Sequence, residues 1–396
     1  MLNHIAIVGA SAAGISAAEA LRQQGFDGRV TLIGAEDHLP YDRPPLSKQL
    51  LSGAWEPERL TLRPRERIDE WGIDLRLGTA ATGLDVDARV LDLDDGTRVG
   101  FDGVIIACGV AARRLPGETP EGVHYLRTLD DALAMRARLN AGGRLLVVGA
   151  GFIGAEAASV ARERGMEVTM VDPLRAPMVT ALGDVIADHL AELHKRHGVD
   201  VRCGTGVREL TASGGHVDGA ILHDGSRVDA DVVVVGIGTV PATGWLADSG
   251  LLRDGAVACD QYCAAAPGVY AAGDVASWYH PLFDARVRVE HRTSAGESGR
   301  LAAINLLGDN PRAFDSVPYF WSDQYDTKLQ AWGQVGADLD FAVVDGDVAS
   351  GRFVAAYGRA GRIVGAVGSG MVKPLMGLRA LIAARGDMPA AVGQRG

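Results

Sequence analysis

The chain has 396 residues, of which 47% are apolar and 22% charged, and its formal charge is −11. This composition excludes a mainly disordered chain, and the length predicts about two to three domains. An acidic chain lacks the basic face that nucleic-acid binding requires, so we expect no nucleic-acid partner and a soluble, cytoplasmic protein.

The N-terminal residues lead directly into an apolar strand, without the charged and apolar regions of a signal peptide. No uncharged apolar run reaches the roughly 18 residues of a membrane span. The longest candidate, residues 145–161, is interrupted by glycines and by Glu156. The sequence therefore predicts neither export nor a membrane partner.

Two segments of the chain resemble each other. Residues 5–36 and residues 145–172 each give an apolar strand, a glycine-rich turn, a helical pattern, a second strand and an acidic residue. Each segment predicts a βαβ unit of about 30 residues.

The glycine-rich turns are typical of dinucleotide binding. The first glycine allows a sharp turn, the second lets the backbone approach a pyrophosphate, and the third lets the helix pack against the strand. The pyrophosphate then lies at the helix N-terminus, and the acidic residue, Glu36 or Asp172, accepts hydrogen bonds from the adenosine ribose. Ser11 replaces the middle glycine of the first turn, and its small side chain still leaves room for a phosphate. The predicted contacts are Gly9, Ser11, Ala13 and Gly14 in the first turn and Gly149, Gly151, Phe152, Ile153 and Gly154 in the second.

The remaining elements follow from periodicity. Between the two units, short strands are predicted at 74–77, 89–93 and 104–107 and a helix at 129–140. After the second unit we expect a helix at 180–196, a β-meander over 206–235 ending in the strand 232–235, a strand at 269–271 and a helix at 294–307. The tail predicts strands at 330–332, 339–344, 353–357 and 363–367 and a last helix near 374–384.

The order of these elements predicts an α/β fold with two Rossmann-like, three-layer nucleotide-binding domains, the second inserted in the first, plus a C-terminal α+β domain. The first nucleotide-binding domain is predicted to comprise 1–111 and 240–314, the second 112–239, and the C-terminal domain 315–396.

Several motifs outside the turns identify a family. They are LPYDRPPLSK at 39–48, LRT at 126–128, GAGFIGAE at 149–156, VGIG at 235–238, YAAGD at 270–274 and PYFWSDQY at 318–325. Together they resemble the oxygenase-coupled, NADH-dependent ferredoxin reductases, the putidaredoxin reductase-like flavoproteins with a glutathione-reductase-like fold. The resemblance covers nearly the whole chain.

The resemblance implies cofactors and roles. The first unit should hold FAD and the second NADH. Lys48 would lie near the flavin N5 edge, and Glu156, near the nicotinamide, would be its partner, because a buried lysine needs one; these two are the predicted catalytic residues. The other implied cofactor contacts are Arg43, Ala81, Gly109, Arg127, Gly238, Gly273, Asp274, Arg292 and Trp321.

The choice between NADH and NADPH depends on Asp172. A carboxylate there bonds the ribose 2′-hydroxyl and repels a 2′-phosphate. Arg175 lies close enough in sequence to offset this repulsion, or to neutralise the NAD pyrophosphate instead. We expect NADH, with NADPH as the less favoured alternative.

The chain departs from the family pattern at Arg292, where dioxygenase reductases usually carry Trp. Arginine would add positive charge near the flavin N1–O2 locus. The hypothesis is that it favours the anionic reduced flavin and raises its potential, and equal potentials for the native chain and Arg292→Trp would contradict it.

The implied activity transfers a hydride from NADH to the flavin and then single electrons to a 2Fe-2S ferredoxin that feeds an oxygenase. Trp321 and Tyr325 are expected to border the flavin and the ferredoxin surface, with core aromatics as the alternative. The sequence leaves open whether the protein forms a homodimer.

The presence or absence of cysteine near the flavin loop distinguishes other activities of this fold. Disulfide reductases, NADH peroxidases and coenzyme A disulfide reductases need cysteine near the flavin loop, and residues 36–55 contain none. Rubredoxin reductase and NADH oxidase stay open, as does an NADH-binding redox-sensing flavoprotein. A sensor would form a long-lived reduced flavin–NAD⁺ complex and reduce ferredoxin poorly.

No metal site is predicted. The cysteines have no common zinc or disulfide spacing and are expected to be small buried apolar residues. The helical histidines lack HExxH spacing and are expected to be solvated. The basic run near the flavin loop predicts a solvated face, with electrostatic attraction of an acidic ferredoxin as the alternative. These sets are Cys108, Cys203, Cys259 and Cys263; His189, His194 and His197; and Arg59, Arg63, Arg65 and Arg67.

Overall fold

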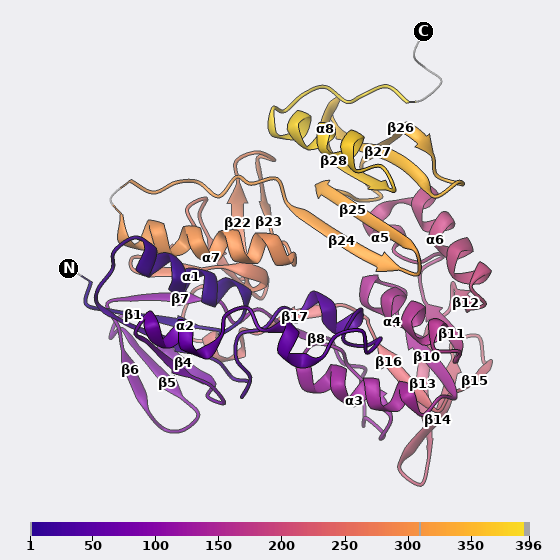
Figure 1. Ribbon diagram of the computed structural model, residues 1–396, viewed down its shortest axis with the longest axis horizontal. Coiled ribbons are helices and arrows are strands. Elements are labelled where there is room, and N and C mark those ends of the chain that lie inside the picture. Colours follow the sequence, from indigo (N-terminus) through magenta and orange to yellow (C-terminus); the bar gives the residue numbers. More distant parts are fainter. Residues whose placement is uncertain (1, 309, 392–396) are drawn as a thin grey trace. The chain divides into compact units, whose positions relative to one another are not determined.

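The computed structural model describes residues 2–308 and 310–391 (Figure 1). These residues divide into two compact units. The first unit comprises 1–42, 58–111 and 240–318, and the second comprises 43–57, 112–239 and 319–396. Two of the boundaries fall within β8 (Val110–Ala112) and β17 (Thr239–Pro241), which pair with each other. The assignment of an FAD, an NAD and a C-terminal domain by function stays a prediction.

The first unit is built on a parallel sheet with only its edge strand β20 antiparallel to its neighbour. Its central strands are buried on both faces, which explains their continuous apolar sequences. The order is β20 (Ala264–Ala266), β21 (Val269–Ala271), β7 (Gly103–Ile106), β1 (His4–Val8), β2 (Arg29–Ile33) and β3 (Ile73–Arg76).

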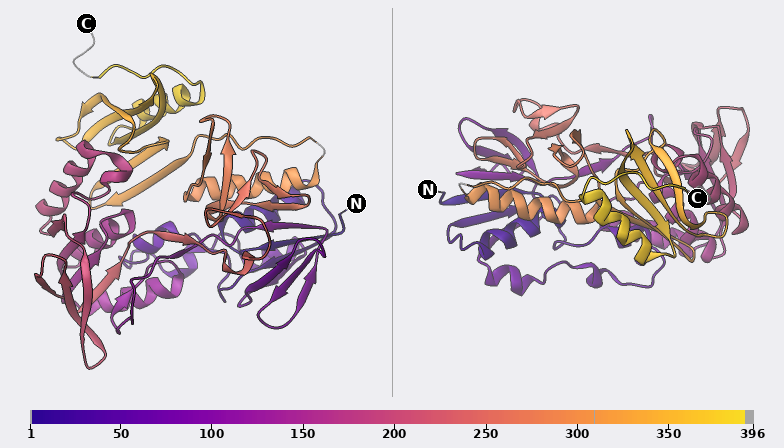
Figure 2. Two further views of the ribbon diagram at one scale, coloured as in Figure 1. Left: turned by 180° about the vertical axis from the view of Figure 1, so that it is seen from behind. Right: turned by 90° about the horizontal axis from the view of Figure 1, so that it is seen from above.

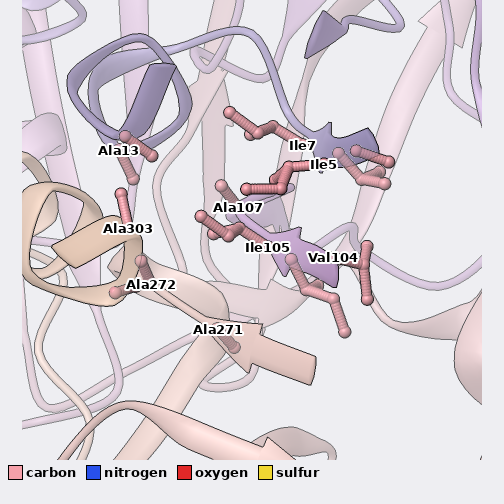
Figure 3. Packing of buried hydrophobic residues seen from close by; sticks show 14 of the residues in the cluster. Ile5, Ile7, Ala13, Val104, Ile105, Ala107, Ala271, Ala272 and Ala303 are labelled. Carbon is pink, nitrogen blue, oxygen red and sulfur yellow. The ribbon is translucent and has the colours of Figure 1, made fainter. Parts of the chain in front are cut away.

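Helices α1 (Ala12–Gln23) and α7 (Arg292–Leu307) pack tightly together over this sheet. A Cβ at Gly299 would lie 2.1 Å from the carbonyl oxygen of Ala13, so the helices approach closely only because α7 has glycine there. Figure 3 shows the small side chains of Ala13 and Ala303 near each other, beside Ile7 and Ala107. This packing fixes where α1 begins relative to β1.

Smaller elements complete the first unit. They form two further sheets, short helical turns and one short helix. These elements are β4 (Ala81–Asp85), β5 (Val90–Leu93), β6 (Arg98–Gly100), β18 (Leu252–Arg253), β19 (Ala256–Cys259), β22 (Ala276–His280), β23 (Ala285–Val287), η2 (Pro57–Leu60), α2 (Arg65–Glu70), η3 (Gly244–Leu246) and η4 (Gly273–Val275).

The second unit contains a parallel sheet of the same kind. Its strand order is β12 (Asp200–Cys203), β11 (Glu167–Asp172), β10 (Arg144–Val148), β16 (Val232–Val235) and β9 (Val123–His124). The helices of this part are α3 (Leu129–Asn140), α4 (Phe152–Glu163), α5 (Val179–Leu182) and α6 (Asp184–Arg196).

Two predictions need correction here. The predicted meander ends at β15 (Arg227–Asp229), after β13 (Val207–Ser213) and β14 (His216–Leu222); β16 leaves it and pairs in parallel with β10. The helix expected over 180–196 is split, because Gly183 adopts a φ of +77°.

The C-terminal segment forms an antiparallel sheet with helix α8 (Val372–Ala383) packed on it (Figure 2). The strand order is β24 (Tyr319–Gln324), β25 (Thr327–Gly333), β28 (Arg362–Ser369), β27 (Arg352–Arg359) and β26 (Asp340–Asp347). β24 was not among the predicted strands. It packs against α4, where Phe152 and Phe320 meet edge to face with ring centroids 5.1 Å apart.

Of the helices in the described residues, none combines the length and the apolar character needed to cross a bilayer. Within the same residues, no cluster of His, Cys, Asp or Glu side chains is arranged to hold a metal ion.

Candidate dinucleotide sites and a buried ion pair

The first group of predicted residues lies at one edge of the first unit's sheet. Gly9 follows β1, Glu36 follows β2, Gly109 follows β7 and Gly273 follows β21. These four strands are neighbours and run parallel. Because the carboxyl ends of parallel strands meet at one edge, the four loops form a crevice of the kind that binds nucleotides.

The glycines of the first turn are required by the backbone. Gly9 has a φ of +119°, and a Cβ there would lie 2.1 Å from the carbonyl oxygen of Ala107. A Cβ at Gly14 would lie 1.8 Å from the carbonyl oxygen of Gly9. The turn therefore brings α1 close to β1, as predicted.

Helix α1 begins at this turn, and its first backbone N–H groups have no acceptor one turn earlier in the helix. Ser11 is the N-cap, but no cap hydrogen bond from its side chain is found among the described residues, and the first turn contains no acidic residue. Helix α3, by contrast, has a complete capping box between Thr128 and Asp131. The N-terminus of α1 thus suits an anion such as a pyrophosphate.

The other predicted residues of the first unit have protein partners. The half-buried Glu36 accepts a 2.6 Å hydrogen bond from the hydroxyl of Tyr41. Asp274 follows Gly273, whose φ is +73°, and its backbone oxygen accepts from Arg288. Ala81 begins β4 and is half-buried.

Arg292 begins α7, and its guanidinium is paired with Asp42. This carboxylate balances the positive charge that the sequence assigned to position 292. The effect of Arg292 on a flavin potential stays a hypothesis.

The second turn repeats the first in the second unit. Gly149 has a φ of +99°, and a Cβ there would lie 2.4 Å from the carbonyl oxygen of Gly236. A Cβ at Gly154 would lie 2.0 Å from the carbonyl oxygen of Gly149, whereas one at Gly151 would meet nothing nearer than 3.8 Å. The packing of the protein does not require the middle glycine, and the space beside it can admit a pyrophosphate. Like α1, α4 begins without a side-chain cap among the described residues.

Asp172 ends β11 and is bound to this turn. Its Oδ2 accepts from the backbone N–H of Ala150 at 2.7 Å and its Oδ1 from that of Leu174 at 2.8 Å. Just beyond the neighbouring strand β12, the buried Oγ1 of Thr205 has no hydrogen-bond partner among the described residues. An adenosine ribose at this sheet edge would find the carboxylate of Asp172 and the unsatisfied hydroxyl of Thr205, so the residues present fit this group.

The remaining predicted residues of the second nucleotide unit are placed as follows. Arg175 is exposed and paired with Asp184 and Asp188 of α6, which raise the pKa of its guanidinium. Ile153 is 39% exposed, and Gly238 has a φ of +93°. Trp321, half-buried in β24, stacks on Tyr319 and lies beneath Lys328.

Lys48 and Glu156 form a buried ion pair, as the sequence predicts. Lys48 follows the turn η1 (Pro44–Ser47), and its Nζ lies 2.7 Å from Glu156 Oε2, with side chains only 9% and 2% exposed. Ser47 Oγ donates to the same oxygen at 2.5 Å, and Ser322 Oγ donates to Oε1 at 2.7 Å. Burial raises the pKa of Glu156, and the charge of Lys48 opposes that rise.

Arg43 and Arg127 also lie in the second unit. The guanidinium of Arg43 donates to the backbone oxygen of Arg127 at 2.8 Å. Both side chains are half-buried. The two predicted FAD contacts are thus brought together by a direct hydrogen bond.

The structure overturns the expectation for one histidine and brings it close to Ser322 and Gln324, which the sequence analysis did not single out. His194, expected to be solvated, is fully buried, because it faces the C-terminal sheet from α6. Its Nε2 lies 3.1 Å from Gln324 Oε1, and Gln324 Nε2 donates to Ser322 Oγ at 3.2 Å. The alternation of β24 places Ser322 and Gln324 on one face, and two polar residues on a buried face were the available signal.

The cysteines are free thiols. Cys259 and Cys263 are buried as expected, but Cys108 and Cys203 are half-buried. Burial raises the pKa of Cys108 and Cys203 to about 11 and that of Cys259 to about 12. Thiols in this state are poor nucleophiles.

The basic run is largely paired. Arg63 binds Glu19, Arg65 binds Asp69 and Arg67 binds Glu70. These pairs reduce the free positive charge available to attract an acidic partner.

Comparison with known proteins adds independent findings. A model described as pyridine nucleotide-disulphide oxidoreductase matches residues 3–299, and one described as reductase C-terminal matches 319–393. Rhodocoxin reductase of Rhodococcus erythropolis is 40% identical over 88% of this chain and 82% of its own length. The ferredoxin--NAD(+) reductase component of the anthranilate 1,2-dioxygenase system of Burkholderia cepacia is 40% identical over 97% of this chain and 94% of its own.

A solved structure is also similar. The reductase in the covalent putidaredoxin reductase–putidaredoxin complex superposes with a TM-score of 0.93 at 31% identity, covering 97% of this chain and 93% of that one.

Proposed function

The chain belongs to the pyridine nucleotide-disulphide oxidoreductase family, and from that premise we propose that it is an FAD-containing, NADH-dependent ferredoxin reductase. It passes electrons from NADH to a 2Fe-2S ferredoxin, which feeds an oxygenase, either a haem monooxygenase or a Rieske dioxygenase. The match of residues 319–393 to the reductase C-terminal model is the strongest support for this proposal. It shows that the similarity to a reductase of an oxygenase system includes the part of the chain beyond the nucleotide-binding units.

The first unit supplies the site for FAD. The turn from Gly9 to Gly14 and the uncapped start of α1 would hold the pyrophosphate, and Glu36 would bind the adenosine ribose. Asp274 is proposed to accept hydrogen bonds from FAD. Arg43 near the pyrophosphate and Arg127 as an FAD contact stay predictions, because both residues belong to the second unit.

The second unit supplies the site for NADH. The turn from Gly149 to Gly154 would hold its pyrophosphate, and Asp172 would accept from the ribose 2′-hydroxyl. Since Arg175 is already paired with two carboxylates, Asp172 keeps its repulsion for a 2′-phosphate. The geometry therefore supports NADH over NADPH.

When bound, FAD accepts two electrons as a hydride and gives them up one at a time. The protein contributes position and charge to this chemistry. Lys48 is proposed to present its ammonium to the reacting end of the nucleotides, with Glu156 holding it in place. Burial raises the pKa of Cys108 and Cys259, which makes these two thiols poor nucleophiles.

The test is an anaerobic titration of the purified protein with one equivalent of NADH, followed by addition of ferredoxin. We expect flavin bands near about 380 and 450 nm that bleach with NADH and return as the ferredoxin is reduced. Bands that bleach but do not return with any ferredoxin would favour a redox sensor or an NADH oxidase. A folded protein that takes up no FAD would overturn the proposal.

A further inference from the structure

A line of buried polar side chains leads away from Glu156 within the second unit. Ser322 Oγ lies 2.7 Å from Glu156 Oε1, Gln324 Nε2 lies 3.2 Å from Ser322 Oγ, and His194 Nε2 lies 3.1 Å from Gln324 Oε1. The hydroxyl of Tyr325 lies 3.0 Å from His194 Nδ1. Ser322, Gln324 and His194 are each no more than 1% exposed. These four side chains are called the buried line below.

The chemistry of these groups gives every hydrogen bond one direction. Because Gln324 donates its amide N–H to Ser322, its oxygen must accept from His194, so His194 has its proton on Nε2. The bare Nδ1 then accepts from Tyr325. Each donor thus points toward the next acceptor and finally toward the carboxylate of Glu156.

The outer end of the line is held under backbone strain. Tyr325 has a φ of +54° in the tight turn between β24 and β25, a region that residues with a Cβ rarely occupy. Its backbone N–H donates at 2.6 Å to the Oγ of Ser159, which lies one turn along α4 from Glu156. Its ring stacks on that of His197, with the ring centroids 3.6 Å apart. Several contacts therefore fix Tyr325 where its hydroxyl reaches His194.

We propose that Ser322, Gln324, His194 and Tyr325 are positioning residues that keep Glu156 ionised and turned toward Lys48. Hydrogen bonds in a chain polarise one another, and donors aligned toward a carboxylate stabilise its charged form. This role rests on the proposed function, in which Lys48 and Glu156 serve the transfer of hydride from NADH.

The charges around the line agree with this role. Lys48 is the charged group that acts on Glu156. His197 lies beside His194, whose burial lowers its pKa to about 4 and so keeps it neutral. Arg162 and Glu163 act on Tyr325, with opposite effects on its pKa. A neutral His194 is what the direction of the line requires.

The first test does not depend on turnover. In the flavin-loaded protein labelled with ¹⁵N-histidine, we expect the signals of His194, assigned by their loss in His194→Gln, to show a proton on Nε2 from pH 6 to 8. Tyr325→Phe should shift the Nδ1 signal, because it removes only the donor. Tyr357→Phe is the matched control, since that buried hydroxyl donates instead to the backbone oxygen of Leu182. A proton on Nδ1, or a charged His194 at pH 7, would overturn the line.

The second test measures the rate of flavin reduction by NADH against pH. Ser322→Ala removes one donor to Glu156, so the pH below which the rate falls should move up by about one unit, and Gln324→Met should move it in the same direction by less. Ser369→Ala, at another buried serine of the same sheet, should leave this pH unchanged. If the rate of flavin reduction falls at the same pH in Ser322→Ala and Gln324→Met as in the native protein, the positioning role is wrong. If NADH does not reduce the native flavin, the proposed function fails, while the tautomer of His194 still decides whether the line exists.

Discussion

The two βαβ units share the glycine turn, and three of the positions at which they differ concern a bound nucleotide. The middle position of the turn is Ser11 in the first unit and Gly151 in the second. Two residues after the last glycine, α1 has Ser16, whereas α4 has the buried Glu156. The acidic residue, Glu36 just beyond β2 or Asp172 at the end of β11, accepts from the side chain of Tyr41 in the first unit and from two backbone N–H groups in the second.

The difference separates what the fold needs from what the chemistry needs. In both units a Cβ at the first or third glycine would collide with a backbone oxygen at 2.4 Å or less. The middle position has no such conflict at Gly151 and tolerates serine in the first unit. The three positions named above would face a ligand, whereas the glycines that the turn requires are the same in both units.

The largest effect expected is at the first glycines. Gly9→Ala should abolish FAD binding, because the new Cβ collides with Ala107 and φ is +119°. Gly149→Ala should keep FAD but lose reduction by NADH, because its clash lies in the other unit. Flavin content by visible absorbance and bleaching by NADH measure the two outcomes.

Gly25 and Gly165 are matched controls for this pair. Each follows its helix with a positive φ, and a Cβ at either would meet nothing within 4 Å. Alanine there should cost roughly 1 kcal/mol of stability and leave both nucleotides bound. Loss of FAD from Gly149→Ala would contradict the division of cofactors between the units.

The next effect concerns the ion pair that only the second unit has at this position. Lys48→Met leaves the buried Glu156 without its cation and should cost about 3–5 kcal/mol at pH 8. Burial raises the pKa of Glu156 in the folded chain, so its ionisation opposes folding as pH rises through that pKa. The cost of Lys48→Met should therefore shrink at pH 5, where more of Glu156 is protonated. Urea unfolding at the two pH values measures the difference.

Two further variants sharpen this measurement. Adding Glu156→Gln to Lys48→Met removes the stranded charge and should recover most of the lost stability. Lys195→Met breaks an exposed pair with Glu192, whose side chains are 51% and 62% exposed, and should cost at most about 1 kcal/mol. A Lys48→Met cost that is equal at both pH values would show that packing, rather than charge, is lost.

The same contrast explains what could be predicted from the sequence. Local patterns specify the glycine turns and the parallel strands. The family resemblance placed Lys48 in a buried position, and the need of a buried lysine for a carboxylate then indicated Glu156. The partner of β16 was missed because an apolar strand carries no mark of the sheet it joins. The burial of His194 was missed because its partners, Gln324 and Tyr325, lie about 130 positions away, at the end of a strand whose polar residues are typical of a surface. Long-range polar contacts leave no periodic signal.

The smallest effect separates the two acids. Asp172→Asn keeps one oxygen for two backbone donors and removes the charge, so the apoprotein should lose about 1–2 kcal/mol. The KM for NADH should rise about tenfold, and the preference over NADPH should narrow, because no carboxylate repels the 2′-phosphate. Glu36→Gln keeps an acceptor for Tyr41 and should lose under about 1 kcal/mol, with the NADH to NADPH ratio unchanged. Steady-state rates with NADH and with NADPH measure the KM and the preference between the two nucleotides for each variant. If Glu36→Gln changes that ratio while Asp172→Asn does not, the two units have been assigned to the wrong nucleotides.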